Sequence, residues 1–317
     1  MMYEAIKNFN KQFEYEPVIE NEDKLERKNK FIVAGMGGSH LSAGLLKIWR
    51  PDLDLTIHRD YGLPDVPNSL VILSSYSGNT EEIVDAFEKG IKNNLSMVVI
   101  SIGGKLIELA KENSIPYIQM QDTGIQSRSA LGYSLRALLK VMEEENMLKE
   151  LNALSESLDP SSYEEAGKAL SKKLKDKVPV VYSSTQNMPI AYSWKIKFNE
   201  TGKIPAFYNV FSELNHNEMT GFDIEDSTKE LSQNFHFIIL RDKEDNPRVL
   251  KRMEVLEKLY KDRGLSVDVI NIEGKDKYHK VFASLLTADF AAYYTAQMYG
   301  LEAEQVPMIE EFKKLIK

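Results

Sequence analysis

The sequence predicts an α/β protein made of two successive units, each a parallel β-sheet flanked by helices. Three apolar runs in the first half, Lys30–Ala34, Val71–Ser75 and Met97–Ser101, lead into turns that contain glycine or serine. A second series of apolar runs begins at Val178. Continuous apolar strands that alternate with helical patterns are typical of parallel sheets covered on both faces. We therefore expect two doubly wound, flavodoxin-like units.

The remaining elements follow from apolar residues at helical or strand spacing. In the first unit we expect an N-terminal helix, a short strand at 55–58, and helices at 40–48, 80–92, 106–113 and 132–145. In the second we expect strands at 178–183, 235–240 and 267–272, with helices around 191–200, 248–263 and 282–299. The expected domains are 1–145 (N-terminal), 146–177 (a charged helical connector) and 178–317 (C-terminal).

Composition excludes several classes of protein. The 317 residues include no cysteine, which excludes disulfides, thiolate metal sites and cysteine nucleophiles and fits a reducing compartment. No apolar run approaches the ~20 residues of a membrane span, and the first residues do not resemble a signal peptide. The net charge of −8 argues against nucleic-acid binding. We expect a cytoplasmic protein, in which any anionic substrate is attracted by local groups.

The most specific local pattern is SSYSGNT at Ser74–Thr80, which ends an apolar strand and opens a helix. Ser75, Ser77 and Thr80 offer hydroxyl donors, Gly78 lets the backbone approach a ligand, and the helix start adds unpaired N–H groups. A phosphate can gain strong hydrogen bonds here without a lysine. The segment therefore predicts a phosphate site.

Two alternatives bear on this prediction. Asn79, followed three residues later by Glu82, could instead be a helix-capping pair. The earlier turn GMGGS, at Gly35–Ser39, departs from the GxGxxG spacing of a dinucleotide site, although Asp60 lies where an acidic partner for a ribose could stand. We favour a turn that lets Gly38, Ser39 and the backbone reach a sugar.

The motifs GMGGSH and SYSGNT resemble those of the sugar isomerase (SIS) family. Two longer segments, SRSALGY at 127–133 and FNETGKIPAFYNVFSELNHNEMTGF at 198–222, closely resemble the bifunctional phosphoglucose/phosphomannose isomerases. This resemblance extends over the chain from Lys30 onward. It implies two SIS domains, a homodimer, no metal or cofactor, and isomerisation between glucose 6-phosphate and fructose 6-phosphate, with or without mannose 6-phosphate.

The resemblance also implies roles for individual residues. Arg128 matches the arginine near the reacting carbons, Glu200 the catalytic base and His216 the ring-opening residue. The residues implied to hold the sugar phosphate are Gly38, Ser39, Ser75, Ser77 and Thr80.

The reaction needs these residue types. A carboxylate that spans two adjacent carbons can move the proton between them, which suits Glu200. The enediolate that forms is negative and needs a fixed cation such as the Arg128 guanidinium. Hexose phosphates are mostly cyclic, and a histidine such as His216 can move the proton that opens the ring. His236, which alternates within a strand, is expected to be a packing residue.

The C-terminal segment adds two further expectations. A lysine near the C-terminus assists ring opening in related isomerases, and Lys313 is the best match, with Lys314 adjacent. Bifunctional members carry a C-terminal threonine thought to accommodate both C2 epimers, but this chain has none after Thr295 and has Gln305 in the region. We therefore expect weak or absent turnover of mannose 6-phosphate. We also expect His216 to act in a neighbouring subunit's site.

Two other functions remain open at this point. A phosphosugar-binding sensor would keep SSYSGNT but would not need Glu200 or His216, and no basic helix-turn-helix segment precedes the first unit. A different SIS-type sugar-phosphate isomerase would keep the same phosphate site with another acid/base set. A nucleotide-binding oxidoreductase is a third option, which the glycine spacing disfavours.

Overall fold

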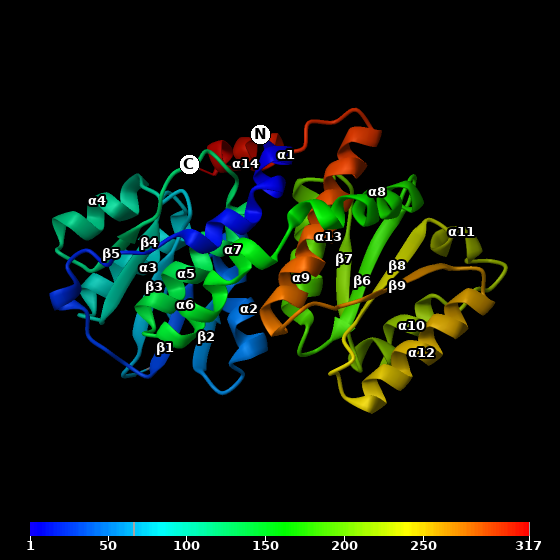
Figure 1. Cartoon of the computed structure of the whole chain (residues 1–317), viewed down its shortest axis with the longest axis horizontal. Coiled ribbons are helices and arrows are strands. Elements are labelled where there is room, and N and C mark those ends of the chain that lie inside the picture. Colours follow the sequence, from blue (N-terminus) through cyan, green and yellow to red (C-terminus); the bar gives the residue numbers. More distant parts are fainter. Residues whose placement is uncertain (66, 317) are drawn as a thin grey trace. The chain divides into compact units, whose positions relative to one another are not determined.

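The computed structural model describes residues 1–65 and 67–316, and the chain folds into two compact units. Residues 8–158 form the N-terminal unit, and residues 1–7 together with 159–317 form the C-terminal unit (Figure 1). The segment 146–177 is divided between them. Its helices α6 (Glu145–Asn152) and α7 (Leu154–Ser157) belong to the N-terminal unit, and α8 (Glu164–Lys173) to the C-terminal unit.

The N-terminal unit contains a parallel sheet with the strand order β2-β1-β3-β4-β5. Its strands are β1 (Lys30–Ala34), β2 (Asp54–His58), β3 (Leu70–Ser74), β4 (Met97–Ser101) and β5 (Tyr117–Gln119). The chain goes from β1 to β2 on one side and then returns to β3 on the other. The gap between the carboxyl ends of β1 and β3 is therefore a topological switch point, where doubly wound folds bind their ligands.

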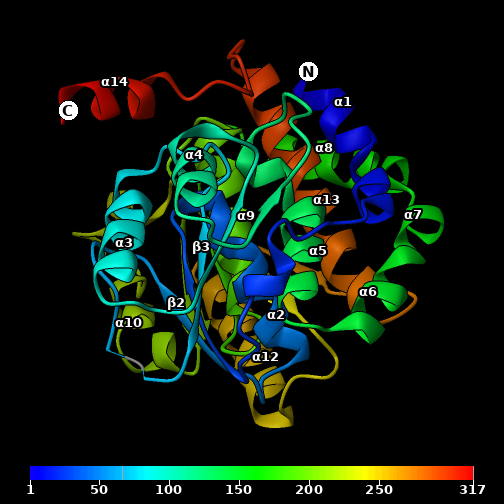
Figure 2. The ribbon, with the colours of Figure 1, turned by 90° about the vertical axis from the view of Figure 1, so that its left-hand side faces the viewer.

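Helices cover both faces of this sheet. Helices α3 (Glu81–Lys92) and α4 (Gly104–Glu112) pack on one face, where Ile83, Phe87 and Leu106 bury against alternate strand residues. Helices α2 (Leu41–Trp49) and α5 (Leu131–Val141) lie on the other, as Figure 2 shows. The short 3-10 helices are η1 (Phe9–Glu14), η2 (Glu22–Lys24), η3 (Gly37–His40) and η4 (Ser127–Ser129). Strands buried on both sides explain the continuous apolar runs in the sequence.

The C-terminal unit contains a second parallel sheet, in the order β7-β6-β8-β9. Its strands are β6 (Val178–Ser184), β7 (Phe207–Phe211), β8 (Phe235–Arg241) and β9 (Ser266–Asn271). Its helices are α1 (Met2–Lys7), α9 (Met188–Glu200), α10 (Glu218–Gly221), α11 (Lys229–Ser232), α12 (Pro247–Asp262), α13 (Lys277–Met298) and α14 (Pro307–Leu315), with η5 (Pro160–Tyr163) and η6 (Glu213–His216). The predicted α/β class with two parallel sheets is confirmed. No helix among the described residues is long and apolar enough to span a membrane.

Helix α1 is held within the C-terminal unit by side-chain contacts with α8 and α13. The Tyr3 hydroxyl donates to Glu164 at 3.0 Å, and Lys7 pairs with the same carboxylate at 3.3 Å. The Tyr3 ring also packs edge-on against Phe290 of α13. These contacts explain why the first seven residues fold with a segment that lies far along the sequence.

Two strands were not predicted from the sequence. Strand β5 has only three residues, and β7 (FYNVF) is an edge strand whose Phe207 is exposed and whose centre is Asn209. Both lie at sheet edges, where one side of the strand is not buried and the apolar pattern is weak. The position of His236 agrees with the packing role predicted for it, since it is buried in β8 and bonds Asp268 at 2.9 Å.

A buried ion pair joins α9 to α13. The Lys197 ammonium lies 2.6 Å from the Asp289 carboxylate, and the two side chains are 2% and 6% exposed. A buried charge without a partner destabilises the folded state, so each residue compensates the buried charge of the other. The pair sits one helical turn before Glu200 and fixes that end of α9.

We predict that Asp289→Ala lowers the free energy of unfolding by about 3–5 kcal/mol, because it leaves the Lys197 ammonium buried without its counter-charge. Urea unfolding followed by circular dichroism measures the change. Asp262→Ala is the matched control. Its pair with Lys258 has the same 2.6 Å separation, but the side chains are 55% and 76% exposed, and the loss there should stay below about 1 kcal/mol. Equal losses for the two variants would contradict the prediction.

Candidate active site

The predicted sugar-phosphate residues gather at the carboxyl edge of the N-terminal sheet. All strands of this sheet are parallel, so the turns that follow β1, β3 and β5 emerge on one side. Those turns carry the predicted residues Gly38, Ser39, Ser75, Ser77, Thr80 and Arg128. The edge includes the switch point between β1 and β3, so topology brings together residues that lie up to 90 positions apart.

Ser39 locks the first turn to the second. Its hydroxyl oxygen accepts a hydrogen bond from the Tyr76 backbone N–H at 2.9 Å, and its carbonyl accepts from the Ser74 hydroxyl at 3.0 Å. Ser39 is 7% exposed. The hydroxyl hydrogen of Ser39 is not used in either bond and can be donated to a ligand oxygen.

The SSYSGNT turn is held by its own hydroxyl groups. The Ser75 hydroxyl bonds the Thr80 hydroxyl at 2.8 Å and accepts from the Gly78 N–H at 3.1 Å. Ser75 is fully buried, whereas Ser77 is exposed and Thr80 half-buried. Ser75 therefore shapes the turn, and Ser77 and Thr80 are its more accessible hydroxyl residues.

Gly78 is required by two independent constraints. Its φ of +70° lies in the left-handed region that favours glycine, and a Cβ added there would overlap the carbonyl oxygen of Gly103. The Gly78 carbonyl in turn accepts from the Leu106 N–H at 3.0 Å. The SSYSGNT turn is thus packed directly against the turn that follows β4.

The start of α3 has no side-chain cap. Thr80 is the N-cap residue, and its side chain makes no capping hydrogen bond. The alternative that Asn79 caps this helix is wrong, because Asn79 accepts from the Lys105 N–H at 3.1 Å and donates to the Ser77 carbonyl at 3.1 Å. The uncapped helix start offers N–H groups and a partial positive charge to an anion.

Gly38 brings the first turn against the turn that carries Arg128. A Cβ at residue 38 would lie 2.8 Å from the Arg128 backbone nitrogen and would overlap the Ser127 hydroxyl. Arg128 is only 2% exposed, although its guanidinium stays charged. A glycine at 38 is therefore needed for the approach of η3 to η4, a role that the sequence pattern did not indicate.

His40 completes this edge, and no role for it was predicted. It follows Ser39, is 4% exposed and forms the N-cap of α2. Burial, together with the nearby Arg59 charge, lowers the pKa of His40 to about 4. The imidazole is therefore neutral at pH 7 and adds no charge to this edge of the sheet.

Glu200 is the last residue of α9, in the C-terminal unit, and is half-buried. The turn after it is held by Asn199, which donates to the Ile204 carbonyl at 3.0 Å, and by the Lys203 ammonium, which donates to the Glu200 carbonyl at 2.6 Å. The same ammonium donates to the Gln305 carbonyl. Gln305 therefore lies beside the end of α9, and the residues of the FNETGK motif around Glu200 fix its backbone.

His216 lies at the opposite edge of the same sheet. Helix α9 runs back from the end of β6 to the start of β7, so Glu200 is at the amino edge. His216 ends η6, which follows the carboxyl end of β7, and it is exposed. The five residues of β7 separate the two edges by about 16 Å. The structure therefore does not bring Glu200 and His216 of one chain together.

Lys313 lies on α14, an exposed helix. Its ammonium pairs with Glu310 at 2.8 Å, and both side chains are 55% exposed. Lys314 is exposed on the same helix. The helix presents an uncovered apolar face, formed by Met308, Ile309, Phe312, Leu315 and Ile316.

The carboxyl edge of the C-terminal sheet differs from its N-terminal counterpart. After β6, Asn187 donates to Ser184 at 3.3 Å and to the buried Asp245 carboxylate at 3.1 Å. The Lys280 ammonium pairs with Asp242 at 2.7 Å. Burial raises the pKa of Asp245. This switch point is filled by the protein's own side chains and presents carboxylates, which disfavour an anionic ligand.

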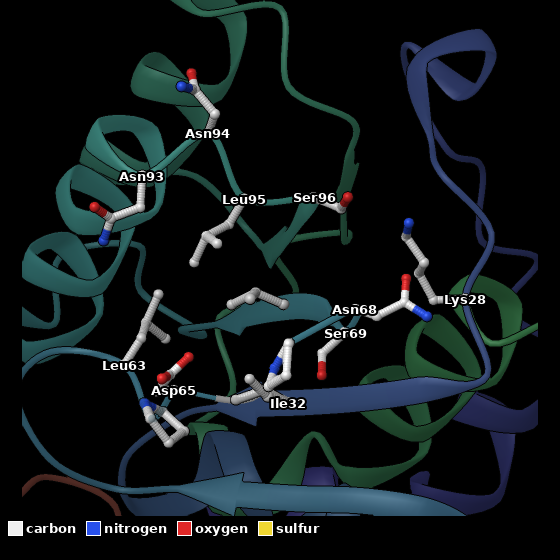
Figure 3. A pocket seen from close by; sticks show the side chains of 13 residues that line it. Lys28, Ile32, Leu63, Asp65, Asn68, Ser69, Asn93, Asn94, Leu95 and Ser96 are labelled. Atoms are coloured by element: carbon white, nitrogen blue, oxygen red, sulfur yellow. The ribbon is translucent and has the colours of Figure 1, made fainter.

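A pocket of about 420 Å³ opens elsewhere in the N-terminal unit (Figure 3). Its walls come from the segments before β1, β3 and β4, so it lies at the amino edge of the sheet. Side chains that line it include Lys28, Leu63, Asn68, Asn93 and Leu95. None of the predicted catalytic or phosphate-binding residues lines it, so size alone does not identify the active site. The described residues contain no group of three or more His, Cys, Asp or Glu side chains arranged to hold a metal.

Comparison with known proteins identifies the class. A family model described as the bacterial phospho-glucose isomerase C-terminal SIS domain matches residues 163–316. The C-terminal domain of glucosamine-fructose-6-phosphate aminotransferase from Francisella tularensis superimposes with a TM-score of 0.67 at 17% identity and 96% coverage of both chains. This likeness shows the fold alone. The two parallel sheets are those of SIS-domain proteins.

Two curated relatives align over almost their whole length. A bifunctional phosphoglucose/phosphomannose isomerase from Caldicellulosiruptor bescii is 33% identical over 335 aligned positions, covering 98% of both proteins. Another from Aquifex aeolicus is 29% identical and covers 100% of this chain and 98% of its own. The chain belongs to the family of bifunctional phosphoglucose/phosphomannose isomerases and is an isomerase. The family predicted from the sequence motifs is confirmed.

We predict that Gly78→Ala weakens binding of glucose 6-phosphate by about tenfold or more. The added Cβ must displace the Gly103 turn, and the left-handed φ costs a further ~1–3 kcal/mol. Isothermal titration measures the affinity, and thermal unfolding measures the stability.

Gly264→Ala is the matched control for this variant. Its φ is +74°, but nothing lies within 4 Å of the added Cβ. It should share the conformational strain and keep the wild-type affinity. If Gly78→Ala binds as tightly as Gly264→Ala, the phosphate is not held by this turn.

Proposed function

We propose that the chain interconverts glucose 6-phosphate and fructose 6-phosphate through ring opening and a cis-enediolate. The observation that carries this proposal is the full-length similarity to bifunctional phosphoglucose/phosphomannose isomerases. The geometry of each unit supports a role for each group. The substrate is a hexose phosphate, and the expectation of a cytoplasmic location remains a prediction from the sequence.

The phosphate would bind at the SSYSGNT turn. Ser77, Thr80 and Ser39 would donate hydroxyl hydrogens, and the uncapped start of α3 would add backbone N–H groups. Ser75 would act by holding the turn in shape, since its hydroxyl already bonds Thr80. These neutral donors can bind a dianion even though the protein carries a net charge of −8.

Glu200 would remove the C2 proton of the aldose and return a proton to C1. The carboxylate takes the proton from C2, and the electron pair of that bond forms the enediolate. The same group then protonates C1, and the hydroxyl proton passes from O2 to O1, which leaves the carbonyl at C2. Its backbone is fixed by Lys203 and by the buried Lys197–Asp289 pair. Such anchoring suits a base that must reach two carbons with little freedom to move.

Arg128 would stabilise the negative enediolate. The guanidinium is permanently charged and nearly fully buried at the carboxyl edge, where its field is less screened than in water. Its close packing against Gly38 holds the backbone of η4 in place.

His216 would open the sugar ring in a site of a second chain, so that the active unit is a homodimer. The separation of Glu200 and His216 by the length of β7 supports this proposal. Since His216 is exposed, it is available to another subunit. Lys313, or Lys314 beside it, would assist the same step from α14.

The choice between glucose and mannose would depend on the groups near Glu200. Gln305 lies beside the end of α9 through the shared Lys203 ammonium. A glutamine in place of the threonine of bifunctional members supports a preference for glucose 6-phosphate.

We predict that the purified chain, in EDTA, converts fructose 6-phosphate mainly to glucose 6-phosphate and forms little mannose 6-phosphate. Separate coupled assays measure the two products. Glu200→Gln should lower kcat by ~10²–10⁴-fold, because the amide cannot accept the proton. Titration of fructose 6-phosphate should show that the variant still binds it. If the wild type binds the sugar phosphate without turnover, the protein is a sensor; equal formation of both aldoses would contradict the preference.

We predict that two inactive variants restore activity when their subunits exchange. In a hybrid dimer of Glu200→Gln and His216→Ala, one site loses both residues and the other keeps both. An equal mixture should therefore recover about a quarter of wild-type activity, because about half of the dimers are hybrids with one working site. Unfolding and refolding the mixture together drives the exchange, and each variant refolded alone is the control. No recovery despite proven exchange would show that His216 serves its own chain.

A further inference from the structure

The segment that carries His216 does not have enough internal structure to hold itself in place. It consists of η6 and α10, which are four residues each, and such short helices are not stable alone. Asn217, between them, has neither helical nor extended dihedral angles, with a φ of −146° and a ψ of −66°. The position of His216 must therefore be set by contacts to the rest of the unit.

Glu218, two residues after His216, makes the polar contacts to the sheet. Its Oε1 accepts from the Tyr182 hydroxyl at 2.5 Å, and its Oε2 accepts from the Asn209 side-chain amide. Tyr182 and Asn209 are direct partners in the register of β6 and β7. Neighbouring strands thus present one donor each, side by side, to the two oxygens of one carboxylate.

The donors themselves are rigid. Tyr182 is fully buried, and its ring packs against Phe211 and Phe237. Burial raises the pKa of Tyr182, so its hydroxyl remains a donor at neutral pH. The side-chain Oδ1 of Asn209 accepts a hydrogen bond from the Val210 N–H at 2.8 Å, which orients the side-chain amide toward Glu218.

A second contact closes the segment on the other side of His216. The Asn217 side chain accepts from the Glu218 N–H at 2.6 Å and donates to Glu213 at 2.6 Å. Leu214 is fully buried in the core beneath. His216 itself is exposed, and no residue of the described ranges 1–65 and 67–316 makes a hydrogen bond to its ring. The contacts that hold the segment are thus made by residues beside His216, and the imidazole remains available to a ligand.

We propose that Glu218 is a positioning residue, which fixes His216 for the ring-opening proton transfer by tying its segment to Tyr182 and Asn209. This inference rests on the proposed isomerase function. The carboxylate suits the role because it accepts two hydrogen bonds at once. Among the described residues, it makes no hydrogen bond to the imidazole itself. A small displacement of a proton-transfer group is enough to lower its rate strongly.

The test separates ring opening from isomerisation. Exchange between the α and β anomers of glucose 6-phosphate, measured by NMR above the spontaneous rate, reports ring opening alone. Glu200→Gln should keep this exchange while losing isomerisation. Glu218→Ala should lower the exchange by ~10²-fold, as should His216→Ala, with KM within threefold of wild type. Glu230→Ala, an exposed carboxylate on α11, is the control and should behave as wild type.

A double variant distinguishes positioning from a general structural role. In the His216→Ala background, Glu218→Ala should cause no further loss of anomer exchange, because there is no imidazole left to position. An equal loss in both backgrounds, or anomer exchange in Glu218→Ala within threefold of Glu230→Ala, overturns the proposal. If Glu218→Ala does not fold, Tyr182→Phe tests the positioning role in its place. A loss of about tenfold in anomer exchange supports the proposal and the wild-type rate overturns it.

The proposed isomerase function and the positioning role of Glu218 can be disproved separately. If the wild type catalyses neither anomer exchange nor isomerisation, the proposed function is wrong and the role of Glu218 falls with it. If the wild type catalyses both and Glu218→Ala does as well, only the positioning role is wrong.

Discussion

In a parallel sheet every connecting helix must run back before the next strand can start, and this constraint decides which residues of the chain can meet. Turns that follow strands gather at one edge, and residues at helix ends gather at the other. In the N-terminal unit the constraint brings the turns after β1, β3 and β5 to a single edge. In the C-terminal unit it separates Glu200, at the end of α9, from His216, after the end of β7. The first arrangement supports the proposed phosphate site, and the second separates the two residues proposed as the base and the ring-opening group.

The two sheets share a topology but differ in how their switch points are used. The N-terminal switch point carries hydroxyl groups and a helix start without a side-chain cap. At the C-terminal one, Asp245 and Asp242 occupy the equivalent edge and are bonded to Asn187 and Lys280. The residues that we propose as acid–base groups in the C-terminal unit lie elsewhere, Glu200 at its amino edge and His216 on the segment between β7 and α11. In this proposal one fold supplies an anion site in one unit and acid–base groups in the other, which agrees with the rule that function depends on the site and not on the fold.

The sequence predicted the parts of the site that are local. Apolar runs identified most strands of both sheets. SSYSGNT predicted a strand, a turn and a helix start that the structure contains, because these parts lie within a few residues of one another. The sequence did not show why residue 38 must be a glycine, since the Ser127–Arg128 turn that requires it is 90 positions away. Nor did it predict the anchoring of Glu218, because Tyr182 and Asn209 meet only through the pairing of β6 with β7, and β7 itself has a weak edge-strand pattern. Long-range partners of this kind need the register of the sheet, which no single segment contains.

We propose that a complete active site needs two chains. The most direct measurement is the specific activity per chain over a dilution series, with the dimer fraction followed by sedimentation velocity at the same concentrations. Activity should fall in proportion to the dimer fraction, and the monomer should retain phosphate binding without ring opening. A folded monomer with the full activity of the undiluted enzyme would contradict it.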